Sequence, residues 1–133
     1  MKQIINTKNA PSAIGPYSQA ILINGTLYTS GQIGINPETS QLEIEDLNTE
    51  TNLVMKNLAA VLKEANMDFN SVIKTTIFLK NMDDFAEVNK IYALYFEKDF
   101  PARETLQVAK LPLNVNVEIS MIAIKWCINL RKL

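Results

Sequence analysis

The sequence has no histidine and one cysteine, Cys127, among its 133 residues. Without histidine there is no Ser-His-Asp triad, no Cys-His pair and none of the usual zinc sites, and a single cysteine forms no internal disulfide. We therefore expect no metal site. If the chain is an enzyme, its chemistry uses carboxylate, arginine, hydroxyl and backbone groups together with water.

Long apolar runs are also missing. The first 19 residues contain no apolar stretch of signal-peptide length, and no later segment approaches the roughly 20 apolar residues of a membrane span, so we expect a cytosolic protein. The net charge is -1, and no cluster of Lys or Arg precedes the end of the chain. A nucleic-acid-binding surface is therefore not expected.

Linkers, repeats and low-complexity segments are absent as well, so the sequence predicts a single domain, 1–133, that ends in a short tail, 126–133. Two segments, 48–67 and 84–98, carry apolar residues at helical spacing. We expect Asp46 or Asn48 to cap the first helix. Asp84, with the Glu three residues later, predicts a capping box for the second.

The remaining apolar runs are rich in β-branched residues and predict six strands. Asn24-Gly25 separates two of these runs and predicts a hairpin with a type I′ turn. The order is β-β-β-α-β-α-β-β, an α+β fold with one six-stranded sheet and two helices on one face. The predicted strands lie in the segments 2–6, 19–24, 26–33, 71–80, 104–111 and 116–126.

The two predicted helices cover one face of the sheet and leave the other face open. In the predicted strand 71–80, apolar residues occur in both alternating sets: Ile73, Thr75, Ile77 and Leu79 in one, and Val72, Lys74, Thr76 and Phe78 in the other. A half-apolar face that the chain's own helices leave uncovered indicates a partner subunit.

Arginine is scarce. Of 13 Lys and Arg residues only two, Arg103 and Arg131, are arginine. From its position alone, Arg103 is more often a surface residue or an ion-pair partner than a functional residue. Its planar guanidinium, however, binds a carboxylate at two points, which an ammonium does not, and this favours a carboxylate clamp.

Other candidates are individually weak. Glu118 lies in an otherwise apolar strand, as an edge charge or as a partly buried carboxylate that activates water. Ser30 and Gly31 mark a bend, and glycine also permits close approach of a ligand. Tyr17 is either a core residue or a pocket wall, and Asn89 in the second helix is either a surface residue or a substrate ligand.

Together these motifs are specific. The segments "NAPSAIGPYSQAI", "YTSGQIGINPETSQL", "VIKTTIFLKNMDDFAEVNKIYALYF" and "FPARETLQVAKLP" followed by "VEISMIAI" occur in this order. This series resembles the reactive intermediate deaminase (Rid, or YjgF) family, in its 2-iminobutanoate/2-iminopropanoate deaminase subtype. The resemblance covers nearly the whole chain.

The resemblance implies a chorismate-mutase-like fold and a homotrimer with ligand sites between subunits. It implies hydrolysis of 2-imino acids, tautomers of reactive enamines such as 2-aminoacrylate, to 2-oxo acids and ammonia without a cofactor, as a control of metabolite damage. By motif, Arg103 binds the substrate carboxylate and Glu118 positions water. Ser30 and Gly31 line the pocket, and Tyr17 forms part of its wall.

The sequence departs from the family pattern near the arginine. Thr105 occupies a position that is often cysteine in this subtype, and Glu104 one that is often small. Thr105 is predicted to share the face of Arg103 and to shape the pocket rather than attack the substrate. Both departures bear on substrate preference, and the tail 126–133 has no functional interpretation.

Two other functions stay open. A carboxylate clamp without turnover makes a sensor or carrier of 2-oxo or amino acids. Some members of the family are associated with RNA cleavage and inhibition of translation, which the net charge does not favour.

Overall fold

The computed structural model describes residues 1–125, so Cys127, Arg131 and the predicted tail 126–133 lie outside the described residues. The order of the elements confirms the predicted β-β-β-α-β-α-β-β arrangement. They are β1 (Gln3–Ile5), β2 (Ala20–Ile23), β3 (Thr26–Thr29), α1 (Leu47–Glu64), β4 (Val72–Leu79), α2 (Phe85–Ala93), β5 (Ala102–Gln107) and β6 (Val117–Ile124).

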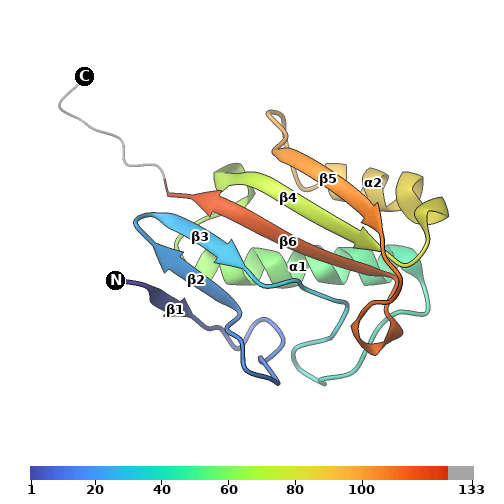
Figure 1. Ribbon diagram of the computed structural model, residues 1–133, viewed down its shortest axis with the longest axis horizontal. Helices are drawn as coiled ribbons and strands as arrows, with labels where there is room; N and C mark the ends of the chain where they lie inside the picture. The colour runs from blue at the N-terminus through green and yellow to red at the C-terminus, as the bar shows by residue number, and fades with distance from the viewer. Residues whose placement is uncertain (126–133) are drawn as a thin grey trace.

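The six strands form one mixed sheet in the order β1-β2-β3-β6-β4-β5. Only β4 and β5 are parallel, and the chain between them forms α2. Figure 1 shows α1 and α2 on the same side of the sheet, behind it in this view. This arrangement confirms the α+β fold with two helices on one face. The core lies between the sheet and α1, where Leu27, Leu58 and Ile119 have no exposed surface.

The predicted hairpin turn joins β2 and β3. Asn24 and Gly25 both adopt positive φ, 50° and 78°, as a type I′ turn requires. The turn fixes the register so that Ile23 pairs with Thr26.

Helix α1 begins where the sequence predicted it. The carboxylate of Asp46 accepts hydrogen bonds from the backbone N–H groups of Asn48 and Thr49 and from the Thr49 hydroxyl, and these bonds lower the pKa of Asp46. The helix ends at Glu64 rather than Met67, because Asn66 takes the left-handed conformation that terminates helices.

Helix α2 begins within one residue of its predicted start, but its predicted capping box and its predicted end were wrong. Asp84 makes no capping hydrogen bond, because the chain enters α2 through a 3-10 turn that Asn81 caps instead. The helix ends at Ala93 rather than residue 98. There the Tyr95 hydroxyl donates to Asn52 of α1 (2.6 Å), and Phe96 packs against aromatic rings, so tertiary contacts overrule helix propensity.

Strand β4 contains an irregularity that the alternation did not predict. Val72 pairs with Ala123 whereas Lys74 pairs with Ile122, so the intervening Ile73 is an extra residue. Val72 is consequently buried on the helix side, and Ile73 is exposed. From residue 74 onward the predicted alternation holds.

Two other strands differ in length from the prediction. Strand β3 ends at Thr29, and Gln32 forms an isolated bridge with Ile119 further along. Strand β5 is Ala102–Gln107 rather than 104–111, which places Arg103 inside the strand.

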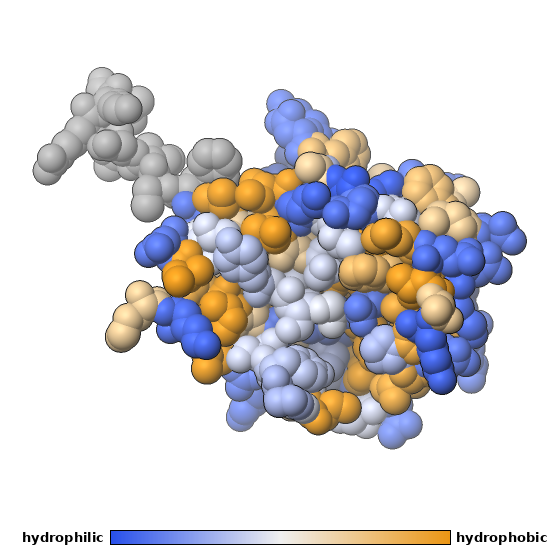
Figure 2. All heavy atoms as spheres, viewed as in Figure 1, coloured by the Kyte–Doolittle hydropathy of each residue, from blue (hydrophilic) through white to orange (hydrophobic). Residues whose placement is uncertain are grey.

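The sheet face opposite the helices remains uncovered in the protomer. Cross-strand partners Ile4, Ile21, Tyr28 and Ile122 form one row across it, and Ile4 and Tyr28 are 61% and 48% exposed. Figure 2 shows hydrophobic residues gathered on this face among hydrophilic ones. The half-apolar face predicted from the sequence is therefore present.

Across residues 1–125, no helix is both long and apolar enough to cross a membrane.

Candidate functional site

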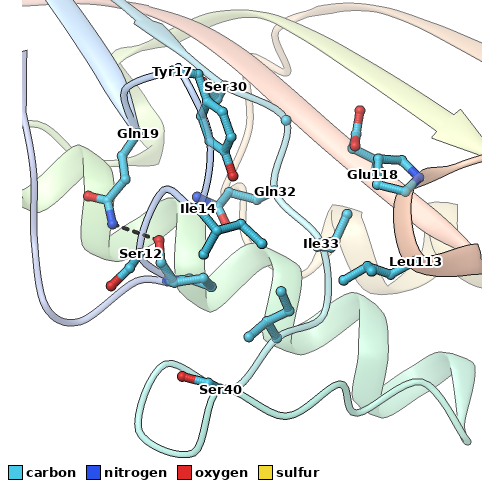
Figure 3. A pocket seen from close by; sticks show the side chains of 14 residues that line it. Ser12, Ile14, Tyr17, Gln19, Ser30, Gln32, Ile33, Ser40, Leu113 and Glu118 are labelled. Atoms are coloured by element: carbon cyan, nitrogen blue, oxygen red, sulfur yellow. Dashed lines mark hydrogen bonds between the residues drawn. The ribbon is translucent and has the colours of Figure 1, made fainter.

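A cavity of about 620 Å³ lies beside Glu118. Three separate segments form it: the loop between β1 and β2, the loop between β3 and α1, and the turn that precedes β6. Figure 3 shows Tyr17 and Ser30 on one side of the cavity and Glu118 on the other. Four of the seven predicted site residues therefore line one space: Tyr17, Ser30, Gly31 and Glu118.

Gly31 is held directly against Glu118. The backbone of Gln32 exchanges two hydrogen bonds with that of Ile119, N–H to O distances of 2.8 and 3.1 Å. A Cβ atom on Gly31 would lie 2.6 Å from the carboxyl carbon of Glu118. Glycine at position 31 leaves room for the Glu118 carboxyl group, which a larger residue would displace, and the close approach expected of this glycine is made by the Glu118 side chain.

Ser30 joins the cavity to the N-terminal loop. Its hydroxyl donates to the carbonyl of Ser18, and its N–H donates to the carbonyl of Gln19 (2.9 Å). Buried Gln19 in turn binds that loop through Thr7 and Pro11. Tyr17 lies on the same loop and is 53% exposed, so it is a wall residue rather than a core residue.

Glu118 is half-buried and has no cationic partner within residues 1–125, where Lys74–Glu104 is the one ion pair. Burial raises the pKa of Glu118 above the ordinary value of a glutamate. A carboxyl group with a raised pKa accepts a proton more readily, which suits a general base.

Arg103 lies in a second cavity, of about 270 Å³, with Asn89 and Tyr92. Its guanidinium carbon lies 5.1 Å from the centre of the Tyr92 ring and 5.6 Å from that of Phe85, within cation–π range. The Tyr92 hydroxyl donates to the hydroxyl of buried Thr75 (3.0 Å), which fixes the ring. Arg103 is thus oriented by aromatic rings, and in the described chain no carboxylate pairs with it.

Thr105 and Asn89 both lie beside Arg103. The sequence predicted that Thr105 shares the face of Arg103. In the sheet, Arg103 pairs with Thr75 and Thr105 pairs with Ile77. Thr75 and Ile77 are both buried on the helix side, so the side chains of Arg103 and Thr105 also point toward α2. The buried Thr105 hydroxyl has no hydrogen-bond partner in the described chain.

The structure does not bring Arg103 and Glu118 together within one protomer. Arg103 pairs with Thr75, which is buried on the helix side, whereas Glu118 pairs with Phe78 on the opposite side of β4. The two side chains therefore leave opposite faces of the sheet. No three acidic, His or Cys side chains of residues 1–125 converge on a possible metal site.

Sequence reasoning missed Glu50, which is fully buried at the start of α1. Its carboxylate accepts hydrogen bonds from the N–H groups of Asn116 (2.9 Å) and Val117 (3.3 Å) and from the Asn116 amide (2.7 Å). These contacts fix the backbone immediately before Glu118. A signal was present: Glu50 lies four residues before Val54, in phase with the apolar stripe of the helix.

Asn57 lies two turns after Glu50 on the same face of α1 and contacts the loop that forms another wall of the cavity. Its side-chain amide donates to the carbonyls of Ile33 and Ile35, at 3.3 and 2.9 Å. The loop between β3 and α1 also has backbone hydrogen bonds of its own, and the Asn57 amide joins the cavity-lining part of this loop to α1.

Comparison with known proteins identifies the family of the chain. Residues 7–125 match the family described as Endoribonuclease L-PSP, and the chain belongs to this family, which includes the reactive intermediate deaminases that it resembles. It is 53% identical to the putative regulator AldR of Lactococcus lactis, over 91% of this chain and 96% of the relative.

The chain is also 46% identical to human 2-iminobutanoate/2-iminopropanoate deaminase, over 94% of this chain and 91% of the relative. A solved structure of Escherichia coli TdcF with bound serine superposes with a TM-score of 0.89 at 35% identity, covering 93% of this chain and 99% of that one. The family prediction and the fold prediction are thus confirmed.

We expect Glu50→Ala to lower the free energy of unfolding by about 3 kcal/mol or more, because three donors lose their acceptor at roughly 1–3 kcal/mol each. Urea unfolding at fixed protein concentration measures this loss. Glu64→Ala, at an exposed position of the same helix, is the control and should change stability by no more than about 0.5 kcal/mol. Similar small losses in both variants would contradict the role of Glu50.

Proposed function

We propose that this protein hydrolyses 2-imino acids, the tautomers of reactive enamines, to 2-oxo acids and ammonia. The observation that carries the proposal is that Arg103 and Glu118, each held in a cavity, both lack an ion-pair partner within residues 1–125. The deaminase name of the human relative supports the same reaction. The cytosolic location stays a prediction from the sequence.

The site that performs this reaction lies between subunits of a homotrimer. In one protomer Arg103 and Glu118 leave opposite faces of the sheet, so a single substrate reaches both only where two protomers meet. The exposed apolar row on the open sheet face supports such an assembly. Closed cyclic symmetry leaves no surface for further growth.

Each residue has one task in the proposed mechanism. The guanidinium of Arg103 binds the substrate carboxylate at two points, assisted by Asn89, while Thr105 shapes this part of the site. Glu118 takes a proton from water as the water oxygen bonds to the imine carbon. The C=N double bond opens and this proton passes to nitrogen, which gives a carbinolamine. The carbinolamine hydroxyl then loses its proton as the carbon–oxygen double bond forms, a second proton reaches nitrogen, and the carbon–nitrogen bond breaks to release ammonia and the 2-oxo acid. Holding the substrate in one orientation accounts for much of the rate, as imines hydrolyse readily.

A sensor that binds 2-oxo or amino acids without turnover is the second candidate, because a relative with 53% identity is named a putative regulator. The two functions share the clamp and differ in the need for Glu118. An assay that supplies an imino acid from an enamine-producing dehydratase and follows 2-oxo acid formation distinguishes the hydrolase from the sensor. A protein that binds 2-oxo acids but does not accelerate the formation of 2-oxo acid is the sensor.

Arg103→Lys should lower kcat/KM for imine hydrolysis by about 10- to 100-fold, since loss of a charge-assisted hydrogen bond costs roughly 1.5–3 kcal/mol. Steady-state kinetics with unchanged circular dichroism would show this. Lys63→Arg, an exposed exchange on α1, should leave the rate unchanged. Near-normal turnover by Arg103→Lys would refute the carboxylate clamp.

Glu118→Gln should retain 2-oxo acid binding, measured by calorimetry, and lose turnover, because an amide does not accept the proton of water. In the unmodified protein the rate should fall as pH decreases through the raised pKa of Glu118, since only the carboxylate acts as a base. If both binding and rate survive in Glu118→Gln, another group activates the water.

The same raised pKa has a consequence for stability. The folded state holds the Glu118 proton more tightly than the unfolded state does. The protonated Glu118 side chain therefore stabilises the fold at low pH, and this stabilisation is lost as pH rises through the pKa of Glu118 in the folded state. Glu118→Gln should therefore melt at a higher temperature than the unmodified protein at neutral pH. The difference should vanish below the unfolded pKa of about 4.3.

Light scattering at micromolar concentration should give about three times the 15.0 kDa chain mass. The reason is that the open sheet face and the divided site both require neighbouring protomers. An active monomer would contradict the proposed assembly.

A further inference from the structure

The cavity beside Glu118 has an aliphatic wall that the reaction itself does not require. Ile14, Ile33, Ile35 and Leu113 line it, and they come from three segments far apart in the sequence. Glu118 is the only charged residue in the lining. Figure 3 shows Ile33 and Leu113 next to Glu118, with Ile14 nearer to Tyr17.

Leu113 is presented to this cavity by an unusual backbone. Leu113 and Asn114 adopt positive φ of 54° and 57° in succession, a conformation that residues with a Cβ rarely take. The N–H of Asn114 donates to the carbonyl of Leu111, and buried Val115 anchors the end of the turn. Leu113 itself is 56% exposed, so burial in the core does not explain its conformation. Strained residues of this kind cluster at ligand sites.

The size of the cavity exceeds what the smallest imino acids need. At about 30 Å³ for each non-hydrogen atom, the volume of a water molecule in the liquid, a three-carbon imino acid fills less than about a third of it. The four aliphatic side chains line part of the 620 Å³ that one protomer encloses.

We propose that the cavity binds the side chain of the substrate and selects 2-imino acids with branched aliphatic side chains, with Leu113 as the specificity-determining residue. This inference rests on the proposed imine hydrolysis and names its substrate class. Apolar side chains exclude water from a methyl or isobutyl group, and each methylene buried in this way strengthens binding about fourfold.

The charge of the lining excludes a second group of substrates. A side-chain carboxylate of similar size would enter a cavity in which Glu118 is the one charged lining residue within residues 1–125. The Arg103 that a neighbouring protomer supplies in the proposed assembly is already bound to the other carboxylate of the substrate. The side-chain carboxylate would lose hydration and meet a like charge. The selection is therefore for apolar character as well as for size.

Calorimetry with three 2-oxo acids tests this selection without turnover. The probes are 2-oxopropanoate, 4-methyl-2-oxopentanoate and 2-oxopentanedioate, of which the last two are similar in size. We expect 4-methyl-2-oxopentanoate to bind at least about tenfold more tightly than either of the others. The corresponding imino acids, generated by an amino acid oxidase, should show the same order in kcat/KM. Equal binding of all three would overturn the inference.

Leu113→Lys provides the residue-level test. In this variant the ratio of kcat/KM for the branched imino acid to kcat/KM for 2-iminopropanoate should fall about tenfold or more. The separate variant Leu113→Met, which keeps an apolar side chain, should retain most of the ratio of the unmodified protein. Leu94→Ser, which removes a more exposed leucine outside the described cavities, is the control and should leave the ratio unchanged. If Leu113→Lys instead dissociates the assembly in light scattering, Leu113 belongs to the interface and the inference is wrong.

The design separates two kinds of failure. If no imino acid is hydrolysed and no 2-oxo acid binds, the proposed function fails and the inference falls with it. If imino acids are hydrolysed without preference for the branched side chain, the function stands and the inference alone fails.

Discussion

The alternation of side chains along β6 is the constraint on which the rest of the structure depends. This strand comes last among the described elements yet lies inside the sheet, between β3 and β4. Its odd-numbered residues, Val117 to Ala123, are buried against the helix layer, and its even-numbered residues face the other way. A shift of one residue would bury Glu118 in the core and expose Ile119, so core packing fixes the direction of the candidate base.

Polar groups inside the core then set the ends of the site. Glu50 fixes the chain before β6, and Asn57 fixes the loop that carries Ile33 and Ile35. Gln32 ties that loop to Ile119. These buried groups are costly unless hydrogen-bonded, and most of the groups that bind Glu50 and Asn57 are backbone groups of the loop after β3 and of the chain at the start of β6. Helix α1 thus serves the core with its apolar stripe and the site with its polar residues.

Local signals in the sequence predicted local structure well. The Asn24-Gly25 turn, the Asp46 cap and the apolar stripe of α1 each depend on residues close in sequence, and all three are confirmed. The end of α2 was wrong because it depends on the contact of Tyr95 with Asn52, and the irregularity at Ile73 depends on pairing with β6. Neither partner is near in sequence. For the site, motif resemblance identified residues that line two cavities, but their division between the two faces follows from strand register, which no short motif contains.

The division between faces has an electrostatic reason in the proposed mechanism. An arginine and a glutamate about 4 Å apart in one protomer attract each other by roughly 4 kcal/mol at an effective dielectric constant near 20, and they would neutralise each other before substrate arrives. Opposite faces of the sheet prevent this pairing within the chain. Arg103 is instead held by the rings of Tyr92 and Phe85, which orient the guanidinium without occupying its hydrogen-bond donors. Gly31 leaves room for the carboxyl group of Glu118, and burial raises the pKa of this group. Each group is therefore positioned by neutral neighbours, and the substrate supplies the carboxylate and the water-reactive carbon that complete the site.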